Sequence, residues 1–311
     1  MKPKLYKSLL YSMVGAGMLS LGSCTDLSET IYNQIASEKY EFTEKDAASM
    51  FAPVYSSLRN FYWAWYGYAD LDICTDMWVI PLRIGVGWGD LYINLHEHTF
   101  HSEIGHFSGL WSNAYSGINA CNKLLADEAV QESEESVAQL RAYRALYYYL
   151  LFDLFRNIPL DTTYDHPDGW LPEQAEPQEV WDFIISELDD IKDKCGDEVE
   201  MGKINNYTVH MILAKMYLNH NAWFDDHSDD SYYRKCVDEL NVIIESNKFS
   251  LAPNYADNFK EDISSSPEII FGIPFEYLYA SGNYFANLWM NEAGRATFGF
   301  TRSEEHTSEL Q

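Results

Sequence analysis

The sequence predicts a mostly α fold in which helix pairs form a scaffold, with one long aromatic-rich loop excursion and minor β-structure. Three observations support this prediction. Apolar residues recur at three- and four-residue spacing over much of the chain, which is the period of an amphipathic helix. The region 61–106 is broken by glycines and crowded with aromatic residues. One short run around Ile269 is rich in strand-forming residues.

The first 23 residues are typical of a secretory signal, with three lysines, an apolar run over 9–21 and two small residues before Cys24. The apolar run is shorter than the roughly 20 residues that span a bilayer. Leu21-Gly22-Ser23-Cys24 resembles the lipobox of bacterial lipoproteins. This resemblance implies cleavage before Cys24, lipidation of Cys24 and a tether over 24–42. The alternative is a soluble secreted protein in which Cys24 has no such role.

Four cysteines remain, at Cys74, Cys121, Cys195 and Cys236. They contain no C-x-x-C pair, so we expect no zinc site. A disulfide is chemically permitted outside the cytoplasm, but the sequence cannot pair these residues. We therefore expect buried free thiols.

The formal net charge is −27. Such acidity argues against nucleic acid as a partner, because phosphates need a basic surface. It also argues against direct binding to an anionic membrane surface, and it suits a solvated protein tethered outside a cell. Apolar residues make up 47% of the chain, which argues against disorder.

The segment 302–311, RSEEHTSELQ, matches codon by codon the translation of a common sequencing-library adapter. We expect these residues to be an artefact and exclude them from the fold prediction. The natural helical domain, over 43–301, is then expected to continue beyond Thr301.

The first predicted helix covers 43–60, with Thr43 as its N-cap and an apolar stripe of Met50, Val54 and Leu58. A second covers 110–125. The strongest pattern covers 137–157 and is expected to end at Pro159.

Three more helices are predicted over 177–196, 205–220 and 231–246. The first has Pro177 in its opening turn and Gly196 as its stop, and the second has an asparagine cap. The segment MILAKMYLNH within the second resembles tetratricopeptide helices, although the repeat period is irregular. Ile269, Ile270 and Phe271 are expected to form a short strand.

Several motifs, in order, resemble the SusD/RagB family of outer-membrane nutrient-binding lipoproteins. They are CTDMWVIPLRIGVGWGDLYINLHEHTF, LWSNAYSGINACNKLL, LRAYRALYYYLLFDLFRNIPL, YYRKCVDELNVIIESNKFSLAPNYADNF and SPEIIFGIPF. The resemblance extends from Cys24 to about Thr301. The chain departs from it at Met77, where an acid is usual, and at Arg156 and Asn157, where glycines are common.

This resemblance implies a lipid-anchored protein on the outward face of the cell outer membrane. Such a protein captures a glycan and forms the lid of a SusC-type TonB-dependent transporter. The helix pairs are then expected to dock on the transporter, and the ligand face is expected to come from the loop excursion and later loops.

The aromatic excursion is the main candidate for a ligand site, because aromatic rings can stack on the C–H faces of sugars. Trp88 lies between Gly87 and Gly89, and exposed aromatic clusters mark binding sites. Nearby polar residues can hydrogen-bond the sugar hydroxyls, and Trp289 is a second aromatic candidate. The predicted ligand-binding residues are Asp76, Arg83, Trp88, Asp90, Asn94 and Trp289. The alternative is that these aromatics are core, which we expect for Trp63, Trp65 and Trp78.

Two polar clusters are candidates for a metal site. His96, His98 and His101 have spacing that a metal could use, but they do not form H-E-x-x-H. We expect structural or surface histidines, with His96 and His98 on one face of a strand. The acidic run 225–230 lacks a calcium-loop pattern, so we expect a solvated loop. No metal and no cofactor are predicted.

Three functions remain open at this stage. The first is a transporter-coupled glycan-binding lipoprotein, the second a helical-repeat adaptor for a protein partner, and the third a surface glycoside hydrolase. There is no G-x-S-x-G elbow. A glycosidase needs two carboxylates at a set separation, which a chain with 48 acidic residues does not identify. We therefore predict a binding protein without catalytic residues.

Overall fold

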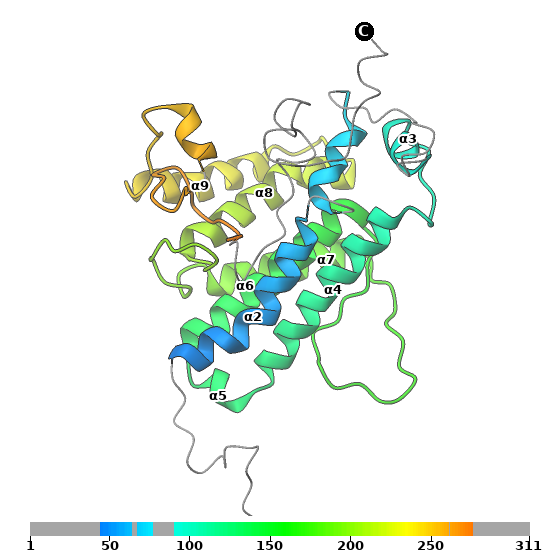
Figure 1. Cartoon of the computed structure of the whole chain (residues 1–311), viewed down its shortest axis with the longest axis horizontal. Helices are drawn as coiled ribbons and strands as arrows, with labels where there is room; N and C mark the ends of the chain where they lie inside the picture. The colour runs from blue at the N-terminus through cyan, green and yellow to red at the C-terminus, as the bar shows by residue number, and fades with distance from the viewer. Residues whose placement is uncertain (1–43, 64–66, 77–89, 261, 276–311) are drawn as a thin grey trace, which may run out of the picture. The chain divides into compact units, whose positions relative to one another are not determined.

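The computed structural model describes residues 44–63, 67–76, 90–260 and 262–275 (Figure 1). Cys24, Trp289 and the segment 302–311 lie outside these residues. The described elements are α2 (Glu44–Phe61), the 3-10 helix η2 (Tyr68–Cys74), α3 (Asp90–His96), α4 (Gly105–Leu125), α5 (Glu128–Gln131), α6 (Glu134–Phe155), α7 (Pro177–Ile191), α8 (Asn206–Phe224), α9 (Ser231–Glu245) and the 3-10 helix η3 (Tyr255–Phe259). The mostly α prediction is confirmed.

The predicted strand around Ile269 is wrong. Within the described ranges the only β-type pairing is an isolated bridge between Pro159 and Gln174. The Ile270 carbonyl instead accepts a hydrogen bond from Asn205 Nδ2 at 3.1 Å, and the Gly272 carbonyl accepts one from the Gly202 N–H at 2.8 Å. The segment is therefore held by the loop before α8 rather than by a neighbouring strand.

Most helix boundaries follow the predicted capping chemistry. Pro177 opens α7 in its first turn. Asn205 caps α8, where its side-chain oxygen accepts the Thr208 N–H at 2.9 Å, and this satisfies one of the free donors at a helix start. Thr43, the expected cap of α2, lies outside the described residues. Gly196 follows the end of α7 with φ of +78°, a conformation that glycine adopts without strain.

Helix α6 ends four residues before Pro159, at Phe155. Arg156 has φ +56° and ψ −62°, and the Asn157 N–H donates to the Phe155 carbonyl at 2.6 Å. This is a γ-turn of the rare positive-φ kind, which is strained for a residue with a side chain. A glycine at this position would adopt the turn without that strain.

The long helices pack mainly on their neighbours in chain order. α2 packs on α4, α4 on α6, α6 on α7, α7 on α8 and α8 on α9. α2 and α4 run in opposite directions (Figure 1). This arrangement confirms the predicted scaffold of helix pairs, in which each apolar stripe is buried against the next helix.

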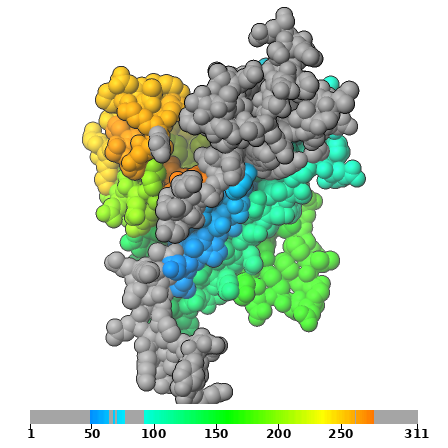
Figure 2. Space-filling view, in the orientation of Figure 1, coloured from blue at the N-terminus to red at the C-terminus, as the bar shows by residue number. Residues whose placement is uncertain are grey.

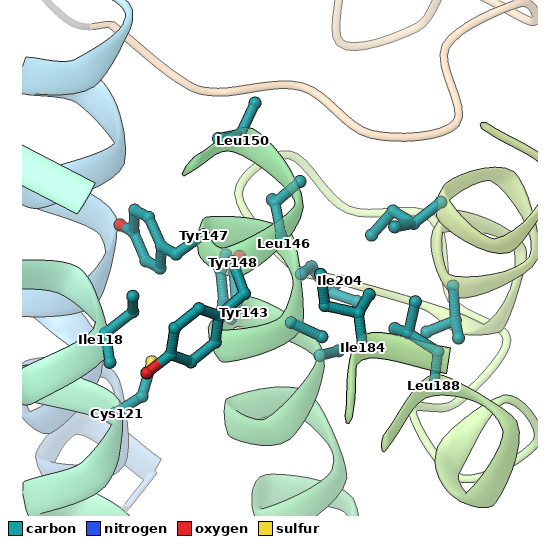
Figure 3. Close-up of a cluster of buried hydrophobic side chains, with 14 of the residues drawn as sticks. Ile118, Cys121, Tyr143, Leu146, Tyr147, Tyr148, Leu150, Ile184, Leu188 and Ile204 are labelled. Atoms are coloured by element: carbon teal, nitrogen blue, oxygen red, sulfur yellow. The ribbon is translucent and has the colours of Figure 1, made fainter. Parts of the chain in front are cut away.

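Tyrosines of α6 fill the centre of the hydrophobic core (Figure 3). Three of them are fully buried, and each carries a hydroxyl that needs a partner. Tyr147 Oη donates to the Val54 carbonyl of α2 at 2.6 Å. α6 also shares one hydrophobic core with α4 and α7. Its residues include Tyr143, Tyr147 and Tyr148 of α6, Ile118 and Cys121 of α4, and Ile184 and Leu188 of α7.

The four cysteines outside the signal are unpaired in the structure. Cys121, Cys195 and Cys236 are buried and Cys74 is half-buried. Burial raises the pKa of Cys121 and of Cys195 to about 12. The expectation of buried free thiols is confirmed for three of the four positions.

Candidate ligand-binding site

The aromatic excursion, predicted to be a long and mostly non-helical loop, contains two short helices, η2 and α3. These two short helices pack on each other around a small hydrophobic core of their own, made by Ile73, Tyr92, Leu95 and Ile104. A short apolar stripe is enough to stabilise such turns once it is buried. The pair of helices is called the η2/α3 unit below.

A buried polar group fixes the η2/α3 unit to the start of α4. His106 Nε2 of α4 lies 3.1 Å from Asp70 Oδ2 of η2, and both side chains are buried. Tyr92 Oη of α3 lies 3.4 Å from the same carboxylate oxygen. One carboxylate therefore joins three helices, and removing it would take this acceptor away from both the histidine and the tyrosine.

The other histidines of this region also have structural contacts, as predicted. His98 Nε2 lies 2.7 Å from the Cys74 carbonyl, and His96 Nδ1 lies 3.4 Å from the Ile73 carbonyl. The expected strand is absent, because His96 ends α3 and His98 adopts φ +56° in the following turn. Within the described parts of the chain, no group of three His, Cys, Asp or Glu side chains is arranged to hold a metal ion.

The predicted ligand-binding residues divide into three groups. Arg83, Trp88 and Trp289 lie outside the described residues, as do Trp65 and Trp78. Asp90 is the first residue of α3, and Asp76 is exposed just after η2. Asn94 is half-buried in α3, where its Oδ1 accepts Thr99 Oγ1 at 3.0 Å and its Nδ2 lies 3.1 Å from His101 Nε2. Of the described candidates, Asp90 and Asn94 therefore lie on α3, and Asp76 lies two residues after the end of η2.

The motif residues of α4 and α6 converge on the chain that follows α6. Tyr115 Oη donates to the Pro159 carbonyl at 2.7 Å. Asn122 Nδ2 donates to the carbonyls of Asp161 at 3.1 Å and Thr163 at 3.2 Å. Tyr148 Oη accepts the Asp161 N–H at 2.8 Å. These contacts fix the base of a long loop between α6 and α7.

The paired arginines of α6 join that base to α7. Arg144 Nη1 donates to Asn122 Oδ1 at 2.8 Å, and its Nη2 donates to Glu187 Oε2 at 2.7 Å. Arg141 Nη2 donates to the other Glu187 oxygen at 2.8 Å. Burial alone would raise the pKa of Glu187, but the hydrogen bonds from the two arginines outweigh it and hold that pKa below the ordinary value.

Comparison with known proteins supports the resemblance seen in the motifs. No protein-family model matches the chain. Among curated proteins, it is 23% identical over 179 residues to a SusD-like protein of Bacteroides ovatus, covering 53% of this chain and 32% of that protein. It is 25% identical over 127 residues to the starch-binding protein SusD of Bacteroides thetaiotaomicron, covering 40% of this chain and 22% of that one. This chain is similar to SusD-like proteins. The match covers less than a third of the length of each of these two curated proteins.

The fold of this SusD-like chain is also found among solved structures. It superposes with a TM-score of 0.60 on surface glycan-binding protein A of Bacteroides thetaiotaomicron, whose structure contains laminarihexaose. The two are 23% identical, and the match covers 76% of this chain and 50% of that one. Among the helices that the structure describes here, none is both long and apolar enough to cross a bilayer.

The exposed aromatics of the α6–α7 loop are not among the ligand-binding residues predicted from the sequence. Tyr164 and Trp170 are 44% and 40% exposed. The signal was present in the segment YDHPDGW, which places two aromatics around a proline and a glycine between two helices. The acidic run 225–230 is an exposed loop between α8 and α9, as predicted.

Proposed function

We propose that this chain is a surface lipoprotein that binds an oligosaccharide or polysaccharide and delivers it to a SusC-type TonB-dependent transporter. Cys24 would carry the lipid that anchors the protein to the outward face of the outer membrane. The observation that carries the proposal is the η2/α3 unit, a small packed unit that contains Asp90 and Asn94, with the exposed Asp76 two residues after η2. Known proteins support the ligand class, because one curated relative is named as starch-binding and one structural neighbour is bound to laminarihexaose.

In this proposal the binding energy comes from ring stacking, and hydrogen bonds at the rim orient the sugar. Trp88 is the proposed platform, with Trp289 as a second ring. Asp76 is exposed at the edge of the unit, where its carboxylate can accept a sugar hydroxyl. Asn94 already bonds Thr99 and His101, so its contribution is to shape the turn after α3 or to exchange those bonds for the ligand.

Replacing Trp88 with alanine should weaken glycan binding without unfolding the protein. Stacking on one aromatic ring contributes roughly 1–3 kcal/mol by analogy with base stacking, which corresponds to about 5- to 150-fold in affinity. The measurement is a polysaccharide array followed by calorimetric titration on the bound glycan, with Tm and far-UV circular dichroism recorded for both chains. Unchanged affinity, or a large fall in Tm, would instead make Trp88 a core residue.

Replacing Cys24 with alanine should move the protein from the membrane fraction to the soluble fraction. The reason is that stable anchoring by acyl chains needs the modified cysteine. The measurement is fractionation of cells expressing each chain, with labelled palmitate to detect the lipid. Equal membrane association of both chains would contradict lipid anchoring through Cys24.

Two other functions remain as alternatives to this proposal. A glycoside hydrolase would release shorter products from a polysaccharide that the chain binds, and chromatography of the incubated glycan detects them. A helical-repeat adaptor would bind no glycan but would retain a protein partner. The names of the relatives favour binding over cleavage, because they refer to starch or glycan binding.

A further inference from the structure

The loop between α6 and α7 carries a second aromatic surface that is separate in sequence from the excursion. It spans 156–176 and appears in Figure 1 as the long green loop that extends away from the helices, and in Figure 2 as a green lobe beside α4. At its base, α4 and α6 side chains bond the backbone of Pro159, Asp161 and Thr163. These bonds hold the base of the loop in one conformation.

The loop holds Trp170 in one defined orientation. The His166 and Trp170 rings are stacked with centroids 3.6 Å apart and planes inclined by 4°. His166 Nε2 in turn lies 2.9 Å from Asp161 Oδ2, the residue at the fixed base. The Trp170 N–H donates to the Pro167 carbonyl at 3.0 Å, and Gly169 has φ +80°, the pattern of a type II turn. Trp170 is therefore preorganised although it is 40% exposed.

A second ring lies on the same loop. Tyr164 is 44% exposed, and Lys123 Nζ of α4 lies 5.6 Å from the centre of its ring, which places Tyr164 against α4. Fixed aromatic rings lose little conformational entropy on binding, which is why they dominate recognition surfaces.

The charge of the loop limits what it can bind. Between 161 and 176 there are five carboxylates and no lysine or arginine, namely Asp161, Asp165, Asp168, Glu173 and Glu176. Asp165 and Asp168 are exposed beside the rings. Lys123 of α4 is the one cation described near these rings, so carboxylates outnumber it and the surface disfavours phosphate, sulfate and uronate groups. A neutral sugar fits it, since hydroxyls donate to carboxylates while the C–H face of the ring stacks on an indole.

We propose that Trp170, stacked on His166, is a second contact site for a neutral glycan, with Asp168 two residues before it and Tyr164 elsewhere on the same loop. The inference shares its ligand class with the proposed function, but it does not depend on Trp88. A site on the α6–α7 loop would hold a second stretch of a long polysaccharide and would increase avidity without altering the first site.

The two sites can be tested separately by fluorine NMR of the full chain labelled with 5-fluorotryptophan. The Trp170 and Trp88 resonances are assigned by their loss in Trp170→Phe and Trp88→Phe chains. The probes are laminarihexaose, maltohexaose and a xyloglucan oligosaccharide. We expect at least one probe to shift the Trp170 resonance saturably, and to do so in the Trp88→Ala chain as well.

In parallel, Trp170→Ala should lower affinity for the corresponding polysaccharide about fivefold or more, with Tm unchanged. Tyr233→Ala is the matched control, because Tyr233 is also 40% exposed but lies on α9. Movement of the Trp88 resonance alone overturns this inference and leaves the proposed function standing. If neither the Trp88 nor the Trp170 resonance moves with any probe, both this inference and the proposed function are wrong. If only the purified transporter perturbs Trp170, the loop is a protein-docking surface and the inference is wrong.

Discussion

Gly117→Ala should lower the free energy of unfolding by about 3 kcal/mol or more, although glycine-to-alanine changes inside helices usually stabilise by up to about 1 kcal/mol. A Cβ atom at Gly117 of α4 would lie 2.2 Å from Tyr147 Cζ. Tyr147 is fully buried, and its hydroxyl is held by the Val54 carbonyl. The ring therefore cannot move aside without overpacking the core and breaking a buried hydrogen bond, costs of about 1–3 kcal/mol each.

Urea denaturation of the parent and Gly117→Ala chains measures the change in the free energy of unfolding. The sign of that change is enough to test the prediction, because an ordinary helix position would be stabilised. Ser116→Ala is the control, because Ser116 is the preceding residue of α4 and is exposed. In a Tyr147→Leu background the same Gly117→Ala change should cost much less, since the ring is gone, and a double-mutant cycle isolates that coupling. A stability equal to or above the parent's would show that α4 and α6 are not packed as described.

Arg144→Ala should destabilise the protein by about 1–3 kcal/mol, the range expected when buried acceptors lose a donor. Arg144 is only 8% exposed. Its loss leaves Asn122 Oδ1 without this donor and Glu187 with Arg141 as its remaining hydrogen-bonded arginine. The control is Lys194→Ala, which removes a more exposed pair with Asp190 and should cost less than about 1 kcal/mol.

The pH dependence separates loss of the ion pair from simple loss of packing. The folded pKa of Glu187 lies below its ordinary value of 4.5, so its contribution to stability is complete above that value. This contribution is lost as pH falls through the folded pKa. Without Arg144 the folded pKa of Glu187 rises, and acid unfolding should begin at higher pH. Acid unfolding curves of the same shape and midpoint would argue against this account.

The helices could be predicted because their apolar stripes are local in sequence. Stripes such as Val54 and Leu58 identify α2, and the caps of α7 and α8 follow from Pro177 and Asn205. The end of α6 could not be predicted from Pro159, because the turn at Arg156 depends on tertiary contacts. One such contact is the Arg156 guanidinium, which lies 5.9 Å from the centre of the Phe224 ring.

The geometry of the candidate site could be predicted less well than the helices, because the contacts that hold it join residues far apart in the sequence. Asp70 and His106 are 36 residues apart, and nothing in the spacing of either indicates the other. The strand expected at Ile269 failed for a related reason, because strand formation needs a partner that a short apolar run cannot specify. The α6–α7 loop was missed because side-chain exposure is a property of the fold and not of the segment.

The order in which the helices pack also bears on how quickly the chain can fold. Most contacts between helices join elements that follow one another in the sequence, so few long loops must close before apolar surface is buried. Domains dominated by such local contacts reach the native state faster than those built from distant pairings. Each added helix can dock on the one before it, and assembly of this scaffold can proceed stepwise along the polypeptide.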